Sequence, residues 1–170
     1  ISKTAGSLFG NSYSFPQVWG NMAYLYSYFV IFLSVFVIIS ISNEFAFRTN
    51  RQHIIDGMSR IDFLHSKSLL VLSLSIGATL FLFISGLIFG YANGGGNPFE
   101  QIEKVGIAFI YTLNYLSFAA LIAFLVKRSG LSIMLLFSYF LVEAILSGVI
   151  NIKLDSFIGD LLPLQCSDEL

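Results

Sequence analysis

Charged residues and cysteine are scarce in this sequence. Only 11% of its 170 residues are Asp, Glu, Lys or Arg, whereas soluble domains average about a quarter. The formal net charge of −1 argues against the basic surface that a nucleic-acid-binding protein needs. Cys166 is the single cysteine, so neither an intramolecular disulfide nor a cysteine-cluster metal site can form. The sequence is instead 56% hydrophobic and 16% aromatic, a composition typical of proteins whose solvent is the lipid bilayer.

Motifs of nucleotide hydrolysis and of the common hydrolases are also missing. The glycines at 94–96 are not followed by the Lys of a phosphate-binding loop, and neither His-Glu-x-x-His nor Gly-x-Ser-x-Gly occurs. His53 and His65 do not form a metal-ligand motif, so packed or exposed imidazoles are favoured over a metal site. We therefore expect a chain that is not an enzyme and that binds no cofactor or metal itself.

Four apolar stretches are long enough to cross ~30 Å of hydrocarbon as helices, which takes about 20 residues each. The first three contain no charged residue, and the fourth contains only Glu143. Unpaired backbone groups in lipid cost several kcal/mol each and no barrel-like alternation occurs, so each stretch must be helical. The predicted fold is an all-α, polytopic transmembrane bundle in a single domain, residues 1–170, with spans at Met22–Ile41, Leu69–Tyr91, Val105–Val126 and Leu131–Ile150.

Basic residues are distributed unevenly between the loops. Six of the nine Lys and Arg lie in Ser42–Ser68 and Lys127–Gly130, which are on the same side of the predicted bundle. The positive-inside rule places this side in the cytoplasm and both ends of the chain outside. Because the chain starts at Ile1 rather than Met, we expect it to be the middle of a longer protein.

Three segments are expected on the outer side. Apolar residues from Phe15 to Met22 recur at helical spacing, which predicts a short amphipathic helix at the membrane interface, with Trp19 at headgroup depth. The Gly-rich stretch 93–98 predicts a flexible turn between the second and third spans. Residues 156–164 predict a second short interfacial helix, too short to cross the membrane.

The cytoplasmic segment Ser42–Ser68 is the longest polar stretch between the predicted spans. Glu44–Ile55 contains no Gly or Pro, so it is expected to continue the first span as a helix. Glu44 and Arg48 have the i, i+4 spacing of a favourable ion pair. The segment can be a solvated loop, or it can be a docking surface, since its mixture of polar and aromatic residues suits a protein contact.

A helix break is expected within this segment. Asp56-Gly57 ends the first helix, and Ser59 then begins another. Asp62 lies at capping-box spacing from Ser59, although Glu or Gln is more usual there.

The same segment resembles the first cytoplasmic segment of type-2 ATP-binding-cassette (ABC) permeases. In that family a Glu closes the second of six spans, an Arg-Thr pair follows on a coupling helix, and a Gly-x-Ser-Arg element precedes the third span. Residues 161–163 also resemble the Leu-Pro of the family's outer element. This chain would then cover the second to fifth spans. The matching residues are Glu44-Phe45-Ala46-Phe47-Arg48-Thr49, Arg51-Gln52, Asp56-Gly57-Met58-Ser59-Arg60 and Lys67.

The resemblance implies an exporter permease in a bacterial inner membrane. Two such subunits, identical or different, form a pathway surrounded by membrane lipid, and separate ABC ATPase subunits bind ATP and Mg²⁺. ATP-driven closure of the ATPases tilts the spans through the coupling helix. The resemblance does not identify the substrate. The residues that the resemblance assigns to ATPase contact are Glu44, Phe45, Arg48, Thr49, Arg51, Ser59 and Arg60.

Two further features have alternative interpretations. Glu143 lies within the fourth span, where a charge is costly, so it marks a substrate-pathway or proton site, or it hydrogen-bonds a neighbouring group such as Asn114. Gly86 and Gly90 form Gly-x-x-x-Gly, with Ser73 and Gly77 at the same spacing. Packing within one subunit is favoured over a dimer seam.

Other classes of function also remain. The chain can be a non-transporting membrane scaffold whose loop Ser42–Ser68 binds a regulator. An intramembrane enzyme using Glu143 is less favoured, because no partner group accompanies that residue.

Overall fold

The computed structural model describes residues 15, 17–47, 49, 57, 59–92 and 97–154, without the side chains of 60, 143, 144 and 146–154. Helices account for most of this part of the chain, and it contains no strand, which confirms the predicted all-α class. Each predicted span lies inside one helix. The helices are α2 (Gln17–Ala46), α4 (Arg60–Ala92), α5 (Glu103–Val126) and α6 (Ser129–Leu154).

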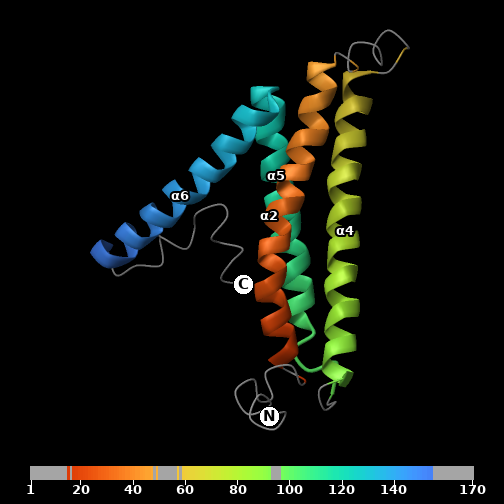
Figure 1. The fold of residues 1–170 in the computed structure, drawn as a ribbon, viewed down its shortest axis with the longest axis vertical. Coiled ribbons are helices and arrows are strands. Elements are labelled where there is room, and N and C mark those ends of the chain that lie inside the picture. Colours follow the sequence, from red (N-terminus) through yellow and green to blue (C-terminus); the bar gives the residue numbers. More distant parts are fainter. Residues whose placement is uncertain are drawn as a thin grey trace, which may run out of the picture.

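Helices α2, α4 and α5 stand side by side as a bundle, and α6 leaves the bundle at an angle (Figure 1). The first three are long and apolar enough to cross a membrane, so the chain is a multi-pass membrane protein. The apolar stretch found in α6, Ser129–Val142, is shorter than a full span, and the crossing of the membrane by α6 stays a prediction.

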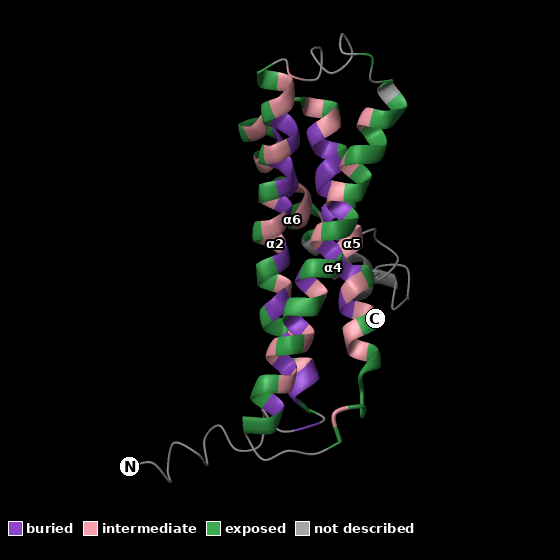
Figure 2. Cartoon of the chain, turned by 90° about the vertical axis from the view of Figure 1, so that its right-hand side faces the viewer, coloured by how far each residue is buried: buried purple, intermediate pink, exposed green. Residues whose placement is uncertain are grey.

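The core lies along the faces that α2, α4 and α5 turn toward one another (Figure 2). In one half of the bundle, Ala119, Ala120 and Ala123 of α5 pack against Val37 and Ile38 of α2 in a single buried cluster. Such small residues allow two helix backbones to approach closely. Large apolar side chains on the outer faces are exposed, as expected where the solvent is lipid, among them Phe32, Phe81 and Leu125.

The predicted interfacial helix around Trp19 is wrong. Gln17 begins α2, which continues without a break to Ala46, and Val18 and Trp19 are fully buried. The Trp19 ring stacks on Phe83 of α4 with centroids 5.8 Å apart, and its indole N–H donates to the Pro98 carbonyl at 3.2 Å. No proline separates this apolar stripe from the span that follows, and α2 continues through Gly20. The stripe therefore packs against α4 instead of the membrane surface.

The Gly-x-x-x-Gly motif of α4 is part of the same contact. A methyl group at Gly86 would overlap the Trp19 ring, and one at Gly90 would overlap the Phe15 ring. These glycines therefore pack within one subunit, as predicted. Gly77 has no atom within 4 Å of the position of a Cβ, and Ser73 is exposed, so these two do not extend the contact among the described residues.

Candidate functional site

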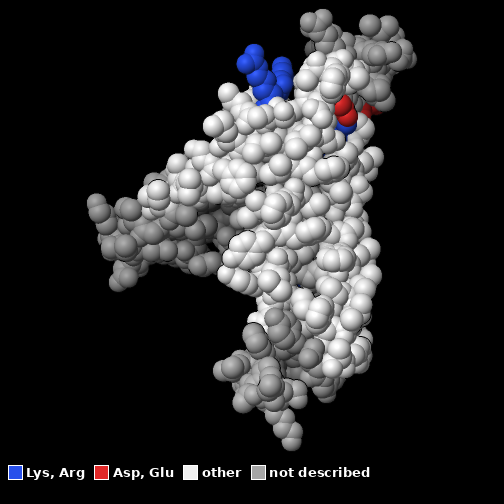
Figure 3. Space-filling view, viewed as in Figure 1, with Lys and Arg blue, Asp and Glu red and all other residues white. Residues whose placement is uncertain are grey.

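Charged side chains gather at the end of the bundle where α2 ends and α4 begins. On the face shown in Figure 3 the blue and red atoms lie at this end. We call it the charged end and define it by Glu44, Lys67, Lys127 and Arg128. It contains the described part of the predicted coupling segment and the connection between α5 and α6.

An ion pair joins the last turn of α2 to the second turn of α4. The Lys67 ammonium donates to Oε1 of Glu44, and the two side chains are only 11% and 27% exposed. Oε2 of Glu44 is buried and, among the described residues, accepts no hydrogen bond. A carboxylate so placed depends on its one cation, because a charge left unpaired there is costly. The predicted partner Arg48 lies outside the described residues.

Three phenylalanine rings lie beside this ion pair. Phe45 of α2, Phe63 of α4 and Phe124 of α5 contact one another edge to face, with centroid separations of 6.2, 6.2 and 6.3 Å. Lys67 lies 5.6 Å from the Phe63 centroid and Lys127 lies 5.8 Å from that of Phe45. Aromatic and cation–π contacts of this kind add about 0.5–1 kcal/mol each. The ends of three helices are therefore held together at the charged end.

The start of α4 has the predicted cap. Gly57 has a φ of +95°, a conformation that favours glycine and that agrees with the expected helix break. The Ser59 amide donates to Oδ2 of Asp62 at 3.0 Å, and the Asp62 amide donates to the Ser59 hydroxyl at 3.1 Å. These reciprocal bonds form the capping box, so the entry of the chain into α4 is fixed.

The structure describes the side chains of some of the predicted ATPase-contact residues and not of others. Glu44 and Phe45 contact α4 and α5, and the Thr49 hydroxyl donates to the Glu44 carbonyl at 3.2 Å. Phe47 was not among the predicted contacts, but it is 76% exposed at the end of α2. Ser59 caps α4. Arg48, Arg51 and the side chain of Arg60 lie outside the part of the chain that the structure describes.

The sequence did not predict that Lys67 is the partner of Glu44, nor a polar contact in the interior of the bundle. The Tyr26 hydroxyl of α2 lies 2.6 Å from that of Thr112 on α5, and both side chains are buried. Since Thr112 donates to the Ala108 carbonyl, Tyr26 is the donor to Thr112. Residue types alone give no sign of this pair, because both are common in apolar spans.

The remaining candidates are only partly placed. Asn114 is half-buried on α5, whereas the Glu143 side chain on α6 is not described, so their predicted hydrogen bond is untested. His65 is exposed and His53 lies outside the described residues, as do residues 93–96 and 156–164. In the described part of the chain, no group of three or more His, Cys, Asp and Glu is placed to hold a metal ion.

One family model matches almost the entire chain. It is described as "Protein of unknown function (DUF2705)" and matches residues 2–165, a range that includes all four described helices. No curated protein and no solved structure matches the chain.

Proposed function

The chain belongs to the DUF2705 family, and from this premise we propose that it is the membrane-spanning permease subunit of an ATP-driven exporter. The observation that carries the proposal is the Glu44–Lys67 pair at the base of the connection between α2 and α4. It lies within the residues that resemble the coupling segment of type-2 ABC permeases. The permease itself hydrolyses nothing, because ATP and Mg²⁺ are bound by a partner ATPase.

The mechanical argument starts from the contacts at the charged end. A partner that pushes on the connection acts on α2 and α4 together, because Glu44 and Lys67 join them, and on α5 through Phe124. Each of these helices is about 35–50 Å long at 1.5 Å per residue. A tilt imposed at the cytoplasmic end therefore displaces the outer end, which is what alternating access requires.

The proposed contact with the ATPase centres on the exposed aromatic ring of Phe47. This ring is 76% exposed among the described residues and lies at the charged end, where α2 ends. Buried aromatic anchors dominate many protein interfaces. Arg48, Thr49 and Arg51 follow it closely in sequence and supply polar contacts with Arg60 of the same segment. Glu44, Phe45 and Ser59 hold the surface in position.

A scaffold that binds a regulator is the second candidate. The same exposed Phe47 favours it, since a docking surface does not require its partner to be an ATPase. The two functions differ in whether a substrate is transported and in whether the partner is an ATPase, so identification of the partner separates them.

The test is purification of the full-length protein from its native membrane in mild detergent, followed by an ATPase assay on the eluate. The proposal predicts a co-purifying P-loop ATPase that is released by the double variant Arg48→Glu/Arg51→Glu. Lys104→Glu, a charge reversal at the opposite end of α5, is the matched control and should retain the partner. Elution without nucleotide hydrolysis, unchanged by the double variant, would favour the scaffold.

A further inference from the structure

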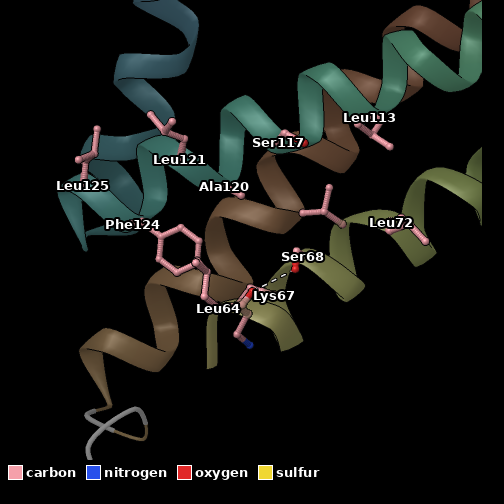
Figure 4. A pocket seen from close by; sticks show the side chains of 11 residues that line it. Leu64, Lys67, Ser68, Leu72, Leu113, Ser117, Ala120, Leu121, Phe124 and Leu125 are labelled. Carbon is pink, nitrogen blue, oxygen red and sulfur yellow. Dashed lines mark hydrogen bonds between the residues drawn. The ribbon is translucent and has the colours of Figure 1, made fainter. Parts of the chain in front are cut away.

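An apolar groove lies between α4 and α5 at the charged end (Figure 4). Its volume is about 430 Å³, within the ~300–1,000 Å³ typical of small-molecule sites. The Phe124 ring and Leu64 face each other near one end, and polar groups enter the lining only at Lys67, Ser68 and Ser117. The groove and the ion pair share Lys67, whose ammonium group pairs with Glu44 of α2.

The dimensions of the groove fit one hydrocarbon chain. Its lining on α5 runs from Leu113 to Leu125, about 18 Å at 1.5 Å per residue. One leaflet of hydrocarbon is about 15 Å thick. The lining on α4 is shorter and runs from Leu64 to Leu72, about 12 Å at 1.5 Å per residue. A single acyl chain about one leaflet long fits along this lining.

Two exposed cations lie close to the groove along the chain, at the end of α5. Lys67 is part of the lining, but its charge is neutralised by Glu44. Lys127 and Arg128 lie two and three residues after Leu125, the last groove residue of α5. Lys127 and Arg128 are exposed, and no carboxylate in the described part of the chain forms an ion pair with either of them. Unpaired cations at the membrane surface beside an apolar groove are complementary to a lipid phosphate.

We propose that this groove binds one anionic phospholipid, with an acyl chain between α4 and α5 and the phosphate at Lys127 and Arg128. The lipid comes from the leaflet at the charged end, since the groove extends one leaflet deep from there. Binding of this lipid does not depend on ATP-driven export. The lipid proposal therefore applies equally to a permease and to a scaffold.

Native mass spectrometry of the detergent-purified full-length protein tests the proposal, with phosphatidylglycerol and phosphatidylcholine as the added probes. Ser117→Phe places a ring in the groove, and Ser138→Phe, an exposed serine at a similar distance from the charged end of α6, is the matched control. Lys127→Gln/Arg128→Gln removes the two exposed cations, together with the cation–π contact between Lys127 and Phe45.

We expect wild type and Ser138→Phe to retain phosphatidylglycerol through activation in the gas phase. Ser117→Phe should lose it, and Lys127→Gln/Arg128→Gln should bind it on the order of tenfold more weakly, with little change for phosphatidylcholine. Equal retention of the two lipids by wild type would overturn the proposal. So would unchanged phosphatidylglycerol binding in both the ring and the charge variants, whichever protein partner is found.

Discussion

Glu44 at the end of α2 and Lys67 in the second turn of α4 form an ion pair that is largely shielded from solvent. The two residues are 23 positions apart, and the connection between them contains the exposed Phe47. The pair therefore closes the base of that connection and links the first two helices of the bundle where a partner would bind.

Removal of one partner of this pair should destabilise the protein. Lys67→Gln leaves the Glu44 carboxylate without its cation, and Oε2 already accepts no hydrogen bond among the described residues. We expect a loss of about 1–2 kcal/mol, less than the ~3–5 kcal/mol of a fully buried pair, because Glu44 is partly exposed. The fraction of folded protein that remains after heating in detergent, measured by size-exclusion chromatography, reports the loss of stability.

The double variant Glu44→Gln/Lys67→Gln distinguishes the loss of the ion pair from the loss of side-chain packing. It removes both charges, so it should be more stable than Lys67→Gln alone. With Glu44→Gln measured as the second single variant, the loss of the double variant minus the sum of the two single losses gives the coupling energy. Strictly additive losses would show that the pair does not contribute to stability as proposed.

The contact between Trp19 and Gly86 predicts opposite effects for the same substitution at two glycines of α4. Gly86→Ala forces the Trp19 ring to move and should cost about 1–3 kcal/mol by overpacking. Gly77→Ala meets no atom within 4 Å and should be neutral or stabilise the helix by up to about 1 kcal/mol.

Intrinsic fluorescence gives a direct measurement of this contact. Trp19 is the only tryptophan, so its emission reports on this site alone. Gly86→Ala should shift the emission to longer wavelength, whereas Gly77→Ala should not. Identical stability and emission of the two variants would contradict the packing described here.

The capping box at the start of α4 makes a third prediction. Ser59→Ala removes the hydroxyl that accepts from the Asp62 amide, and it should cost about 1 kcal/mol. Ser66→Ala is the control, because Ser66 is exposed in the helix interior and should change stability by less than about 0.5 kcal/mol. Hydrogen exchange of the first turn of α4 should rise only in Ser59→Ala; an equal rise in both variants would count against the cap.

Local features of the sequence predicted much of the local structure. The apolar stretches indicated all four helices, and Gly57 with the Ser59–Asp62 spacing indicated where α4 begins. Each of these signals depends on residues within one or two turns of each other. Length, apolarity and capping chemistry are sufficient to place a transmembrane helix along the chain.

Contacts between helices were harder to predict. The stripe that contains Trp19 has the same spacing whether it faces lipid headgroups or α4, so periodicity could not choose between them. The partner of Glu44 was sought at Arg48, one turn away, whereas the observed partner is Lys67 on another helix. The groove also combines residues of α4 and α5, so it becomes visible only when the two helices are placed side by side.

Site-specific photo-crosslinking at Phe47 tests the central claim most directly. A photoreactive amino acid replaces Phe47 in the full-length protein in native membranes, and Phe99, also highly exposed but at the opposite end of the bundle, is replaced as the control. The account predicts a covalent adduct with a P-loop ATPase at position 47 and none at position 99. An adduct at position 47 with a protein that binds no nucleotide, or adducts that do not depend on position, would contradict the permease function.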